Sequence, residues 1–527
     1  MTSKEIPLAE TGMFPKIILD YLAGNDFLKQ FYSLSPDLDS FGEAIKNRRF
    51  TTQSRENLVS VLLDQYSSIG ITDEKVLANI HSLKNENTFT VTTGHQLCVF
   101  TGPLYFIYKI LTTIKLSEEL KLKYPNNHFV PVFWLASEDH DFEEVNHIHL
   151  FNKTVTWKTD SQNKPVGKIS THSLSGFINE VKTLFANSEH LPSLLLLFEE
   201  AYLKSSTLSE ATQKIVHTLF GKYGLVTIEP DDERLKQSFK KVMLDDIIEQ
   251  KSFKAISRTN SVLEEKYKLQ INGREINFFY LSEQGRHLIK KVDGTFIVAN
   301  ADIKFSEIEI KKEIETHPEK FSPNVVLRPV YQEMILPNLA YIGGPGEIAY
   351  WLQLKDVFEI HDIDLPILWL RNSFMLLNKS LQNRIEKTGL EVSVYFESSE
   401  KLSKLFLEKV AGFDINETTD LIDGNIQKMI DELKSLDNQL ASKLIKHKNE
   451  QIAFYGKLKK EINEKLKEKL EQDLTKVLKI KETLFPNGTP QERFENYLQY
   501  DSSFPTSLIQ IIFDNLDLNG QFKILYI

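Results

Sequence analysis

The fold is decided by a stretch that reads FVPVFWLASEDHD at residues 129–141. It begins as an apolar run rich in β-branched and aromatic residues and ends abruptly in a polar cluster, a pattern typical of a buried strand in a parallel sheet. The same pattern occurs upstream in TFTVTTGHQ at residues 88–96. Between the two lies a predicted helix at residues 103–124, with Thr101 or Gly102 as its cap. Pro103 suits the first helical turn, and neither glycine nor a further proline occurs before Pro125. Strand, helix and strand in this order predict a doubly wound α/β fold.

Two later apolar runs continue the predicted sheet. Residues 225–229 meet a polar group at 230–232, and residues 366–370 meet another at 371–373. In doubly wound sheets, ligands bind in the crevice beyond the carboxyl ends of the strands. All four polar clusters fall at such ends, so the pattern predicts a ligand pocket along one edge of the sheet.

Two stretches interrupt this rhythm and are predicted to be insertions that frame the pocket. Residues 151–171 alternate polar and apolar side chains, and residues 277–300 predict paired strands with turns at 283–285 and 293–294. The predicted domains are the first half of the core at 1–150, a connecting insertion at 151–220, a core strand region at 221–235, a second connecting insertion at 236–320, the second half of the core at 321–390, a helical coiled-coil arm at 391–490 and a C-terminal segment at 491–527 that packs back on the core.

Residues 422–474 carry apolar side chains at the spacing of a coiled-coil seam. The seam lapses between Ala441 and Gly456, which favours an antiparallel hairpin with its turn in that interval over one continuous rod. A helix that overhangs its partner could pair with a second subunit, so a homodimer held by the coiled coil is predicted. The seam positions are Ile422, Ile426, Met429, Leu433, Leu436 and Leu440, then Leu458, Ile462, Leu466, Leu470 and Leu474.

The composition is that of a soluble globular protein, with 41% apolar and 26% charged residues among 527. The 63 basic and 73 acidic residues give a net charge of −10, which disfavours general binding to nucleic acid or to anionic membranes. Cys98 is the single cysteine, which excludes an intrachain disulfide and indicates a reducing compartment; its apolar neighbours favour a buried, inert thiol over a nucleophile. With no secretory segment and no apolar run of membrane-spanning length, a cytoplasmic protein is predicted.

The first two polar clusters are predicted to carry chemistry. Thr92, Gly94 and His95 fit the pattern T-x-G-H, in which a histidine and backbone amides face the phosphates of a nucleotide; a tight turn with a hydrogen-bonded histidine is the alternative. Residues 137–141 place three carboxylates and an imidazole directly after a strand, which suits general-base chemistry or cation binding, or else a solvated helix cap. The histidines that follow match no closed metal-site spacing, and no metal is predicted.

Two further clusters complete the predicted pocket. GGPGE at residues 343–347 precedes a predicted helix at 348–357, so flexible backbone meets a helix start, as in anion-binding sites, although a turn with positive φ explains the glycines equally well. Asn338 and Tyr341 lie upstream, where they could orient a ligand. Arg371 at a strand end suits a carboxylate or a phosphate, with a structural ion pair as the alternative.

Several stretches together are specific enough to indicate a family. They are TGHQ at 93–96 with TGPLY at 101–105, PVFWLASEDHDF at 131–142, GGPGE at 343–347, and LFP at 484–486 with QER at 491–493. In this order, and over essentially the whole chain, they resemble the bacillithiol biosynthesis cysteine-adding enzymes. The resemblance implies a Rossmann-like core with connecting insertions, a dimeric coiled-coil domain and a ligase that joins cysteine to glucosaminyl malate. It also implies a core similar to nucleotidylyl transferases and class I aminoacyl-tRNA synthetases.

Candidate site residues follow from these patterns and from the resemblance. Amide formation calls for an activated carboxyl group, for which a nucleotide, ATP or ADP, is expected, while the cofactor itself stays open. The predicted catalytic residues are His95, Glu138, Asp139 and Asp141. The predicted substrate-binding residues are Thr92, Gly94, Gln96, Thr101, Gly102, Tyr105, Trp134, His140, Asn338, Tyr341, Gly343, Gly344, Gly346, Glu347, Arg371, Asn372 and Ser373. Two other functions stay open: a nucleotidylyl transferase acting on another small acid, and a non-catalytic coiled-coil scaffold.

Overall fold

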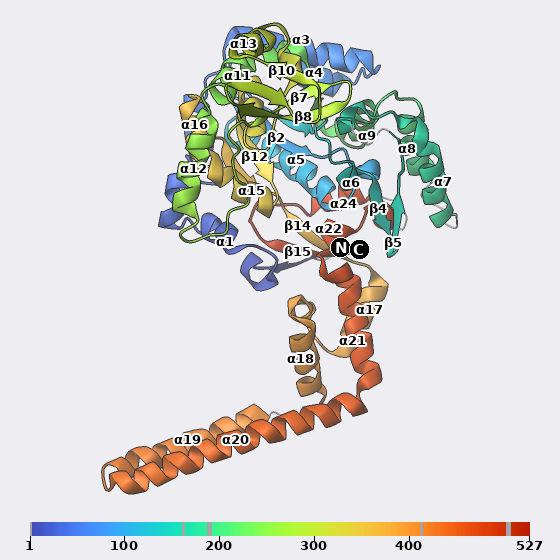
Figure 1. Ribbon diagram of the computed structural model, residues 1–527. Coiled ribbons are helices and arrows are strands. Elements are labelled where there is room, and N and C mark those ends of the chain that lie inside the picture. The colour runs from blue at the N-terminus through green and yellow to red at the C-terminus, as the bar shows by residue number, and fades with distance from the viewer. Residues whose placement is uncertain (1–2, 161–163, 187–191, 412–414, 502–506) are drawn as a thin grey trace. The chain divides into compact units, whose positions relative to one another are not determined.

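The computed structural model describes residues 3–160, 164–186, 192–411, 415–501 and 507–527. Its internal contacts divide the chain into two compact units, whose elements are labelled in Figure 1. The larger unit comprises Met13–Phe374 and Glu492–Phe522, and the smaller one comprises Met1–Gly12, Met375–Gln491 and Lys523–Ile527. No helix within the described ranges is long and apolar enough to cross a lipid bilayer.

The larger unit is built on a five-stranded sheet in which every strand runs parallel to its neighbours. Its order is β13 (Ile367–Leu370), β12 (Asn338–Gly343), β2 (Thr88–His95), β3 (His128–Leu135) and β6 (Val226–Ile228). β2 and β3 are buried almost throughout, because connecting helices cover the faces of a parallel sheet. The doubly wound α/β prediction is confirmed. The chain proceeds from β2 outward to β6 and returns on the other side of β2, so the switch in strand order lies between β2 and β12.

The crossover from β2 to β3 is made by α5 (Tyr105–Lys123), which packs against both strands. The helix is as predicted, but a cap at Thr101 or Gly102 is wrong. Leu104 precedes the first helical turn, and no side chain caps it. Thr101 and Gly102 have φ values of 67° and 62° and belong to a separate left-handed turn. A Cβ at Gly102 would lie 2.6 Å from the Cβ of Cys98, which explains the glycine.

The first insertion follows β3 and is mainly helical. A short antiparallel pair, β4 (His147–Leu150) and β5 (Lys153–Thr156), precedes α7 (Leu174–Leu184), α8 (Pro192–Leu203) and α9 (Leu208–Phe220). The strand-like alternation predicted for residues 151–171 holds for β5, whereas residues 166–173 form two short 3-10 turns. Part of that prediction, residues 161–163, lies outside the described ranges.

The second insertion contains an antiparallel sheet of order β10-β9-β8-β7-β11. Its strands are β7 (Phe278–Ser282), β8 (Gly285–Val292), β9 (Thr295–Val298), β10 (Ile303–Phe305) and β11 (Phe321–Pro323). The paired strands predicted for residues 277–300 are confirmed. Asp293 and Gly294 connect β8 to β9 with φ values of 47° and 78°, the two positive values that a tight hairpin turn requires.

The smaller unit combines a three-stranded sheet with long helices. The sheet order is β1 (Ser3–Ile6), β15 (Phe522–Tyr526) and β14 (Ser373–Leu377). The helices are α17 (Lys379–Thr388), α18 (Ser399–Ala411), α19 (Ile415–Lys434), α20 (Asn438–Lys469) and α21 (Glu471–Leu484). α19 and α20 lie side by side in opposite directions (Figure 1), which confirms the predicted hairpin.

The hairpin turn lies at residues 435–437, and its predicted position at 441–456 is wrong. The Asp437 carboxylate caps α20 by accepting two backbone N–H hydrogen bonds. α20 then runs unbroken through the region where the apolar pattern lapses. There Lys448 pairs with Asp423 across the hairpin at 3.0 Å, so a polar contact takes the place of an apolar one.

Candidate active site

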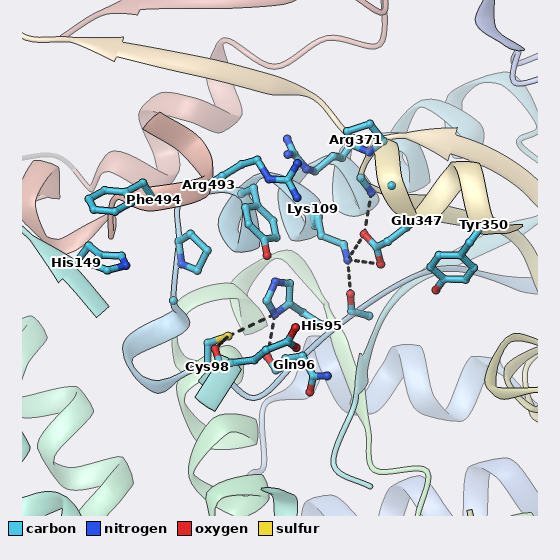
Figure 2. Close-up of a pocket in the computed structure, with 18 of the residues that line it drawn as sticks. His95, Gln96, Cys98, Lys109, His149, Glu347, Tyr350, Arg371, Arg493 and Phe494 are labelled. Carbon is cyan, nitrogen blue, oxygen red and sulfur yellow. Dashed lines mark hydrogen bonds and ion pairs between the residues drawn. The ribbon is translucent and has the colours of Figure 1, made fainter. Parts of the chain in front are cut away.

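A two-lobed cleft lies beyond the carboxyl ends of β2, β3, β12 and β13, at the switch in strand order. The first lobe has a volume of about 570 Å³ and the second of about 480 Å³. All residues that line them belong to the larger unit. The lobes share a wall made of Gly94, His95, Gln96, Ile271, Glu347 and Tyr350. Figure 2 shows the first lobe.

The structure brings together at this cleft most of the site residues predicted from the sequence. Besides the shared wall, the first lobe is lined by Gly102, Tyr105, Gly344, Gly346 and Arg371. The second lobe is lined by Trp134, Glu138, Asp139 and Tyr341. The predicted residues that line neither lobe are Thr92, Thr101, His140, Asp141, Asn338, Gly343, Asn372 and Ser373.

His95 ends β2 at the shared wall. Its Nδ1 lies 2.9 Å from the backbone oxygen of Gln96, so Nδ1 carries the proton and donates it, which leaves Nε2 as an acceptor. The rings of Tyr105 and Phe106 pack against the imidazole at centroid distances of 5.1 and 5.2 Å. Burial, together with the nearby charge of Lys109, lowers the pKa of His95 to about 4. His95 is therefore neutral at pH 7 and offers hydrogen bonds rather than an acidic proton.

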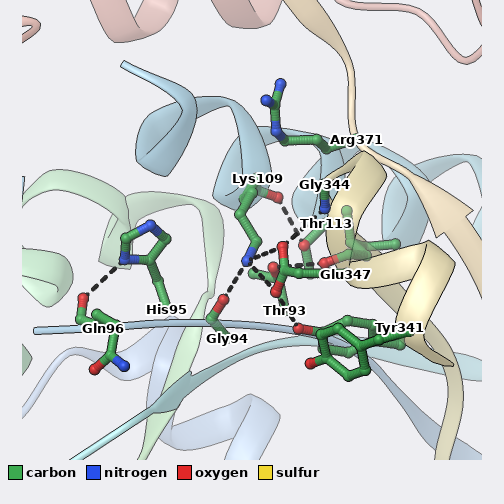
Figure 3. Close-up of polar contacts among 12 residues, drawn as sticks. Thr93, Gly94, His95, Gln96, Lys109, Thr113, Tyr341, Gly344, Glu347 and Arg371 are labelled. Atoms are coloured by element: carbon green, nitrogen blue, oxygen red, sulfur yellow. Dashed lines mark hydrogen bonds and ion pairs between the residues drawn. The ribbon is translucent and has the colours of Figure 1, made fainter. Parts of the chain in front are cut away.

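Lys109 of α5 lies beneath the cleft and was not predicted as a site residue. Its side chain is 1% exposed, and its Nζ lies 2.9 and 2.8 Å from the two carboxylate oxygens of Glu347. The same nitrogen donates to the backbone oxygen of Gly94. Glu347 also accepts hydrogen bonds from the Tyr341 hydroxyl at 2.6 Å and the Gly344 backbone nitrogen at 2.8 Å. Figure 3 shows how this pair ties the end of β2, at Gly94, to the glycine turn after β12.

This network fixes the charge of Glu347. Burial alone would raise its pKa, but the Lys109 ammonium and the hydrogen bonds from Tyr341 and Gly344 lower the pKa to about 2. Glu347 therefore holds backbone in place as a permanent carboxylate and is no base. One signal in the sequence points to Lys109: it is the charged residue inside the apolar run YFIYKILTTI at 105–114.

The acidic cluster after β3 holds two carboxylates of different character. Glu138 is buried 2.6 Å from Lys236, and burial raises the pKa of Glu138 in spite of this neighbour. Asp139 lies 3.4 Å from Arg286 and accepts a hydrogen bond from Gln96. Burial alone would raise the pKa of Asp139, but its hydrogen bonds and the charge of Arg286 lower it. Asp139 thus stays ionised at the wall, whereas Glu138 takes up a proton more readily.

Asp141 and His140 continue this cluster away from the lobes. Asp141 is exposed and caps α6 (Phe142–Val145), where its carboxylate accepts a hydrogen bond of 3.3 Å from the backbone nitrogen of Glu144. His140 Nδ1 lies 3.3 Å from the Arg286 guanidinium. For Asp141, the structure shows the helix cap that was the alternative interpretation of these residues.

Arg371 is likewise engaged within the protein. Its guanidinium makes two contacts with the Glu492 carboxylate, at 2.7 and 3.0 Å, and both side chains are buried. The ion pair, which was the alternative interpretation of Arg371, compensates its charge. Arg493 lines the first lobe as well, is exposed, and forms no ion pair with any residue in the described ranges. It is the better placed of the two to attract an anion.

Thr92 and Asn338 join neighbouring strands and point away from the lobes. The Asn338 carboxamide oxygen accepts hydrogen bonds from Thr92 at 2.8 Å and Thr90 at 3.1 Å, and its nitrogen donates to Glu333 at 2.7 Å. Asn372 is fixed in a similar way, by donating to the backbone oxygen of Asp517 at 2.6 Å. These residues support the strands whose ends form the cleft.

The glycine turn after β12 leads into two helices where the sequence predicts one at 348–357. They are α15 (Pro345–Trp351) and α16 (Lys355–Ile360), separated by a 3-10 turn. Of the four glycines that line the first lobe, Gly346 is exposed, whereas Gly94, Gly102 and Gly344 are buried; the exposed backbone at Gly346 suits a phosphate-bearing ligand. Among the residues that the structure describes, no three His, Cys, Asp or Glu side chains are grouped closely enough to hold a metal ion.

Two family models together match almost the whole chain. Residues 1–372 match the model described as "Bacillithiol biosynthesis BshC, N-terminal Rossmann-like domain". Residues 374–527 match "Bacillithiol biosynthesis BshC, C-terminal coiled-coil domain".

Similar curated proteins carry the name "Putative cysteine ligase BshC". The protein from Christiangramia forsetii is 38% identical, over 100% of this chain and 99% of its own length. The protein from Flavobacterium johnsoniae is 39% identical over 96% of each chain, and that from Cytophaga hutchinsonii is 38% identical over 98% of this chain and 97% of its own. A solved Campylobacter jejuni structure described as a "putative arginyl t-RNA synthetase" covers 85% of this chain and 99% of its own, with 13% identity and a TM-score of 0.22, too low to bear on the fold.

Proposed function

This chain belongs to the bacillithiol biosynthesis BshC family, and from that premise we propose that it is the ligase that joins L-cysteine to glucosaminyl malate in the last step of bacillithiol formation. The name shared by its relatives supports a cysteine ligase. The observation that carries the proposal is the two-lobed cleft, because its lobes meet at a wall of polar side chains where two bound molecules can react.

Joining a carboxylate to an amine is unfavourable in water, so the carboxyl group of cysteine must first be activated. We expect ATP to do this. Attack by the cysteine carboxylate on the α-phosphorus of ATP would give an acyl-adenylate and release pyrophosphate. Attack on the γ-phosphorus would give an acyl-phosphate and release ADP. The glucosamine nitrogen then attacks the acyl carbon, AMP or phosphate leaves, and the nitrogen loses a proton. The exposed Gly346 at the start of α15 and the exposed Arg493 of the first lobe suit the phosphates.

The shared wall offers acceptors for the amine. The side-chain nitrogen of Gln96 donates to Asp139, which leaves the Gln96 oxygen as a buried acceptor that no residue in the described part of the chain satisfies. An N–H of the bound amine would satisfy this oxygen. Asp139 and the neutral Nε2 of His95 provide further acceptors. Glu138, whose pKa is raised by burial, is the proposed recipient of the proton that the amine releases.

The proposal is tested by incubating purified protein with L-cysteine, glucosaminyl malate and ATP, followed by mass spectrometry. Bacillithiol with AMP indicates adenylation, and bacillithiol with ADP indicates phosphorylation. Asp139→Asn should lower the rate by roughly 100-fold, the scale of a lost acid–base or orienting group. Glu143→Gln, an exposed change in the same cluster, is the matched control and should leave the rate unchanged. Pyrophosphate release that needs neither substrate would support a nucleotidylyl transferase instead.

We also propose that two copies pair through the hairpin of α19 and α20. Several large apolar side chains of this hairpin are exposed, among them Leu421 at 65% and Phe454 at 61%. A second copy would remove them from water, which a large exposed apolar surface favours. Sedimentation should show a dimer for the full chain and a monomer for Leu421→Glu combined with Phe454→Glu. A monomeric full chain, or a dimeric double variant, would contradict this pairing.

A further inference from the structure

The second lobe is lined by three arginines and three carboxylates, and two of the arginines take no part in the ion pairs of these carboxylates. Each carboxylate that lines it contacts a cation: Asp139 contacts Arg286 at 3.4 Å, Glu347 contacts Lys109 at 2.8 Å, and Glu138 contacts Lys236 at 2.6 Å, a lysine that it shares with Asp231. Arg274 and Arg328 line the same lobe, and neither forms an ion pair with a residue in the described ranges. The lobe therefore presents two guanidinium groups that are not engaged in an ion pair within the described ranges.

Arg328 begins α14 (Arg328–Ile335), and no carboxylate in the described ranges lies within ion-pair distance of it, although Glu333 and Glu347 are near enough to feel its charge. Its hydrogen bonds go to neutral groups, the Gln332 oxygen at 3.2 Å and the Tyr350 hydroxyl at 3.4 Å. Its guanidinium carbon lies 5.7 to 5.9 Å from the centroids of three aromatic rings, those of Trp134, Tyr341 and Trp351. Aromatic faces favour a guanidinium and restrict its orientation, and its N–H edge remains suited to a two-point contact with a carboxylate.

Arg274 differs from Arg328 in its exposure. It lies in the second insertion, ahead of β7, and its side chain is exposed to solvent at the lobe. The lobe thus has one guanidinium held among aromatic rings and one that is open to water. A ligand with two carboxylates matches this pair in charge, and each carboxylate can accept paired N–H bonds from an arginine.

We propose that the second lobe is a dicarboxylate subsite that binds the malyl group of glucosaminyl malate, with Arg328 pairing with one carboxylate and Arg274 with the other. This assignment rests on the proposed function, because it names the part of the acceptor that the lobe recognises. It places the malyl group in the second lobe and leaves the amino sugar to reach Gln96 at the shared wall and Asp139 beside it.

The test is isothermal titration calorimetry of the full chain with L-malate, and with acetate as the monocarboxylate. Wild-type protein should bind L-malate at least roughly tenfold more tightly than acetate, since only L-malate engages both arginines. Arg328→Gln should weaken L-malate binding by roughly 10- to 100-fold, the scale of a lost hydrogen-bonded charge pair. The affinity of Arg328→Lys for L-malate should lie between those of the wild type and Arg328→Gln, because an ammonium keeps the positive charge but lacks the planar pair of N–H groups.

Two further variants complete the test. Arg274→Gln should weaken L-malate binding less than Arg328→Gln, since Arg274 is exposed to water. Arg258→Gln is the matched control, because Arg258 is a solvent-exposed arginine outside both lobes and its loss should leave the affinity unchanged.

Unchanged L-malate affinity in both Arg328→Gln and Arg274→Gln would overturn the assignment, as would equal affinity for acetate and L-malate. Melting temperatures show whether the Arg328 variants are folded, and the exposed Arg274 site keeps the test decisive if they are not. Failure of the ligase proposal gives a different result: no bacillithiol forms, while L-malate binding persists and still depends on Arg328.

Discussion

Two carboxylates flank the cleft, and their chemistry is opposite. Glu347 lies after β12 in contact with Lys109, and its pKa is lowered to about 2. Glu229 follows β6, and no cation contacts it among the described residues. Burial, together with the nearby charge of Asp231, raises the pKa of Glu229 to about 7.

The contrast does not come from a lack of hydrogen bonds. Glu229 accepts them from the hydroxyls of Ser137 and Ser209 and from the backbone nitrogen of Asp231. Glu347 accepts them from one hydroxyl and one backbone nitrogen as well as from Lys109. The cation is the difference, since a full charge stabilises a buried carboxylate more than neutral dipoles do. A permanent carboxylate can anchor backbone, whereas Glu229 changes its protonation near neutral pH.

The largest effect is expected from Lys109→Met, which leaves the Glu347 carboxylate, 28% exposed, without its cation. Breaking a fully buried ion pair from one side costs about 3–5 kcal/mol of unfolding free energy, and the partial exposure of Glu347 places the expected cost at the lower end of that range. The pKa of Glu347 should rise above its ordinary value of 4.5, because only the hydrogen bonds from Tyr341 and Gly344 then oppose the effect of burial. Gly94 also loses the donor to its backbone oxygen, so ligation should fall with stability. Urea unfolding and the ligase assay measure the two effects.

Lys115→Met on the same helix is the matched control. Lys115 contacts Glu119 one helical turn away at 3.1 Å, with the two side chains 25% and 34% exposed, and its loss should cost less than about 1 kcal/mol of unfolding free energy, as it does for i,i+4 pairs on helices. Combining Lys109→Met with Glu347→Gln should recover part of the lost stability, because no carboxylate is left without a cation. Equal free energies of unfolding for Lys109→Met and Lys115→Met would show that the ion pair of Lys109 and Glu347 does not support the fold.

The sheet and the edge that carries the cleft could be predicted because burial on both faces leaves a clear pattern. A parallel strand is apolar throughout and becomes polar where it ends, as residues 129–141 do. The position of the hairpin turn could not be predicted, because a lapse in the apolar pattern can mean a turn or a polar contact. At Lys448 and Asp423 it means a contact.

The same reasoning divides the site residues. His95 and Asp139 could be predicted because strand ends deliver them to one edge. Arg286 and Arg328 could not, since they come from an insertion strand and a helix start that only the folded chain brings near the cleft, while Lys109 is marked in the sequence only as the charged residue of an apolar helical run. Sequence patterns also favoured too many positions: Thr92, Asn338, Asp141 and Asn372 support neighbouring segments and line neither lobe. A strand-end pattern identifies the edge, but not which side chains face the ligand.

A smaller effect, confined to one pH range, is expected from Glu229→Gln. Because the pKa of Glu229 is raised from 4.5 to about 7, the folded protein keeps this proton in a pH range where the unfolded chain has released it. Relative to the variant, the wild type should therefore gain stability as the pH falls from about 7 to 4.5, by up to about 1.4 kcal/mol per pH unit. Urea unfolding at a series of pH values measures this gain. A difference that is constant with pH would show that Glu229 is ionised like Glu347.

The smallest effect is expected from Tyr341→Phe, which removes one hydrogen bond from Glu347. The Phe ring can keep the stacking on Trp351, now at 4.2 Å, and Lys109 stays in place, so the cost should be about 1 kcal/mol. The stabilisation by Glu347 should still be present above pH 4.5 and lost only as the pH falls toward 2. Ser209→Ala removes one hydroxyl from Glu229 instead, and there the titration range should move upward, because no cation holds the charge. If Tyr341→Phe raised the titration range of Glu347 as much as Ser209→Ala raised that of Glu229, Lys109 would not set the charge of Glu347. The contrast between the two carboxylates would then need another cause.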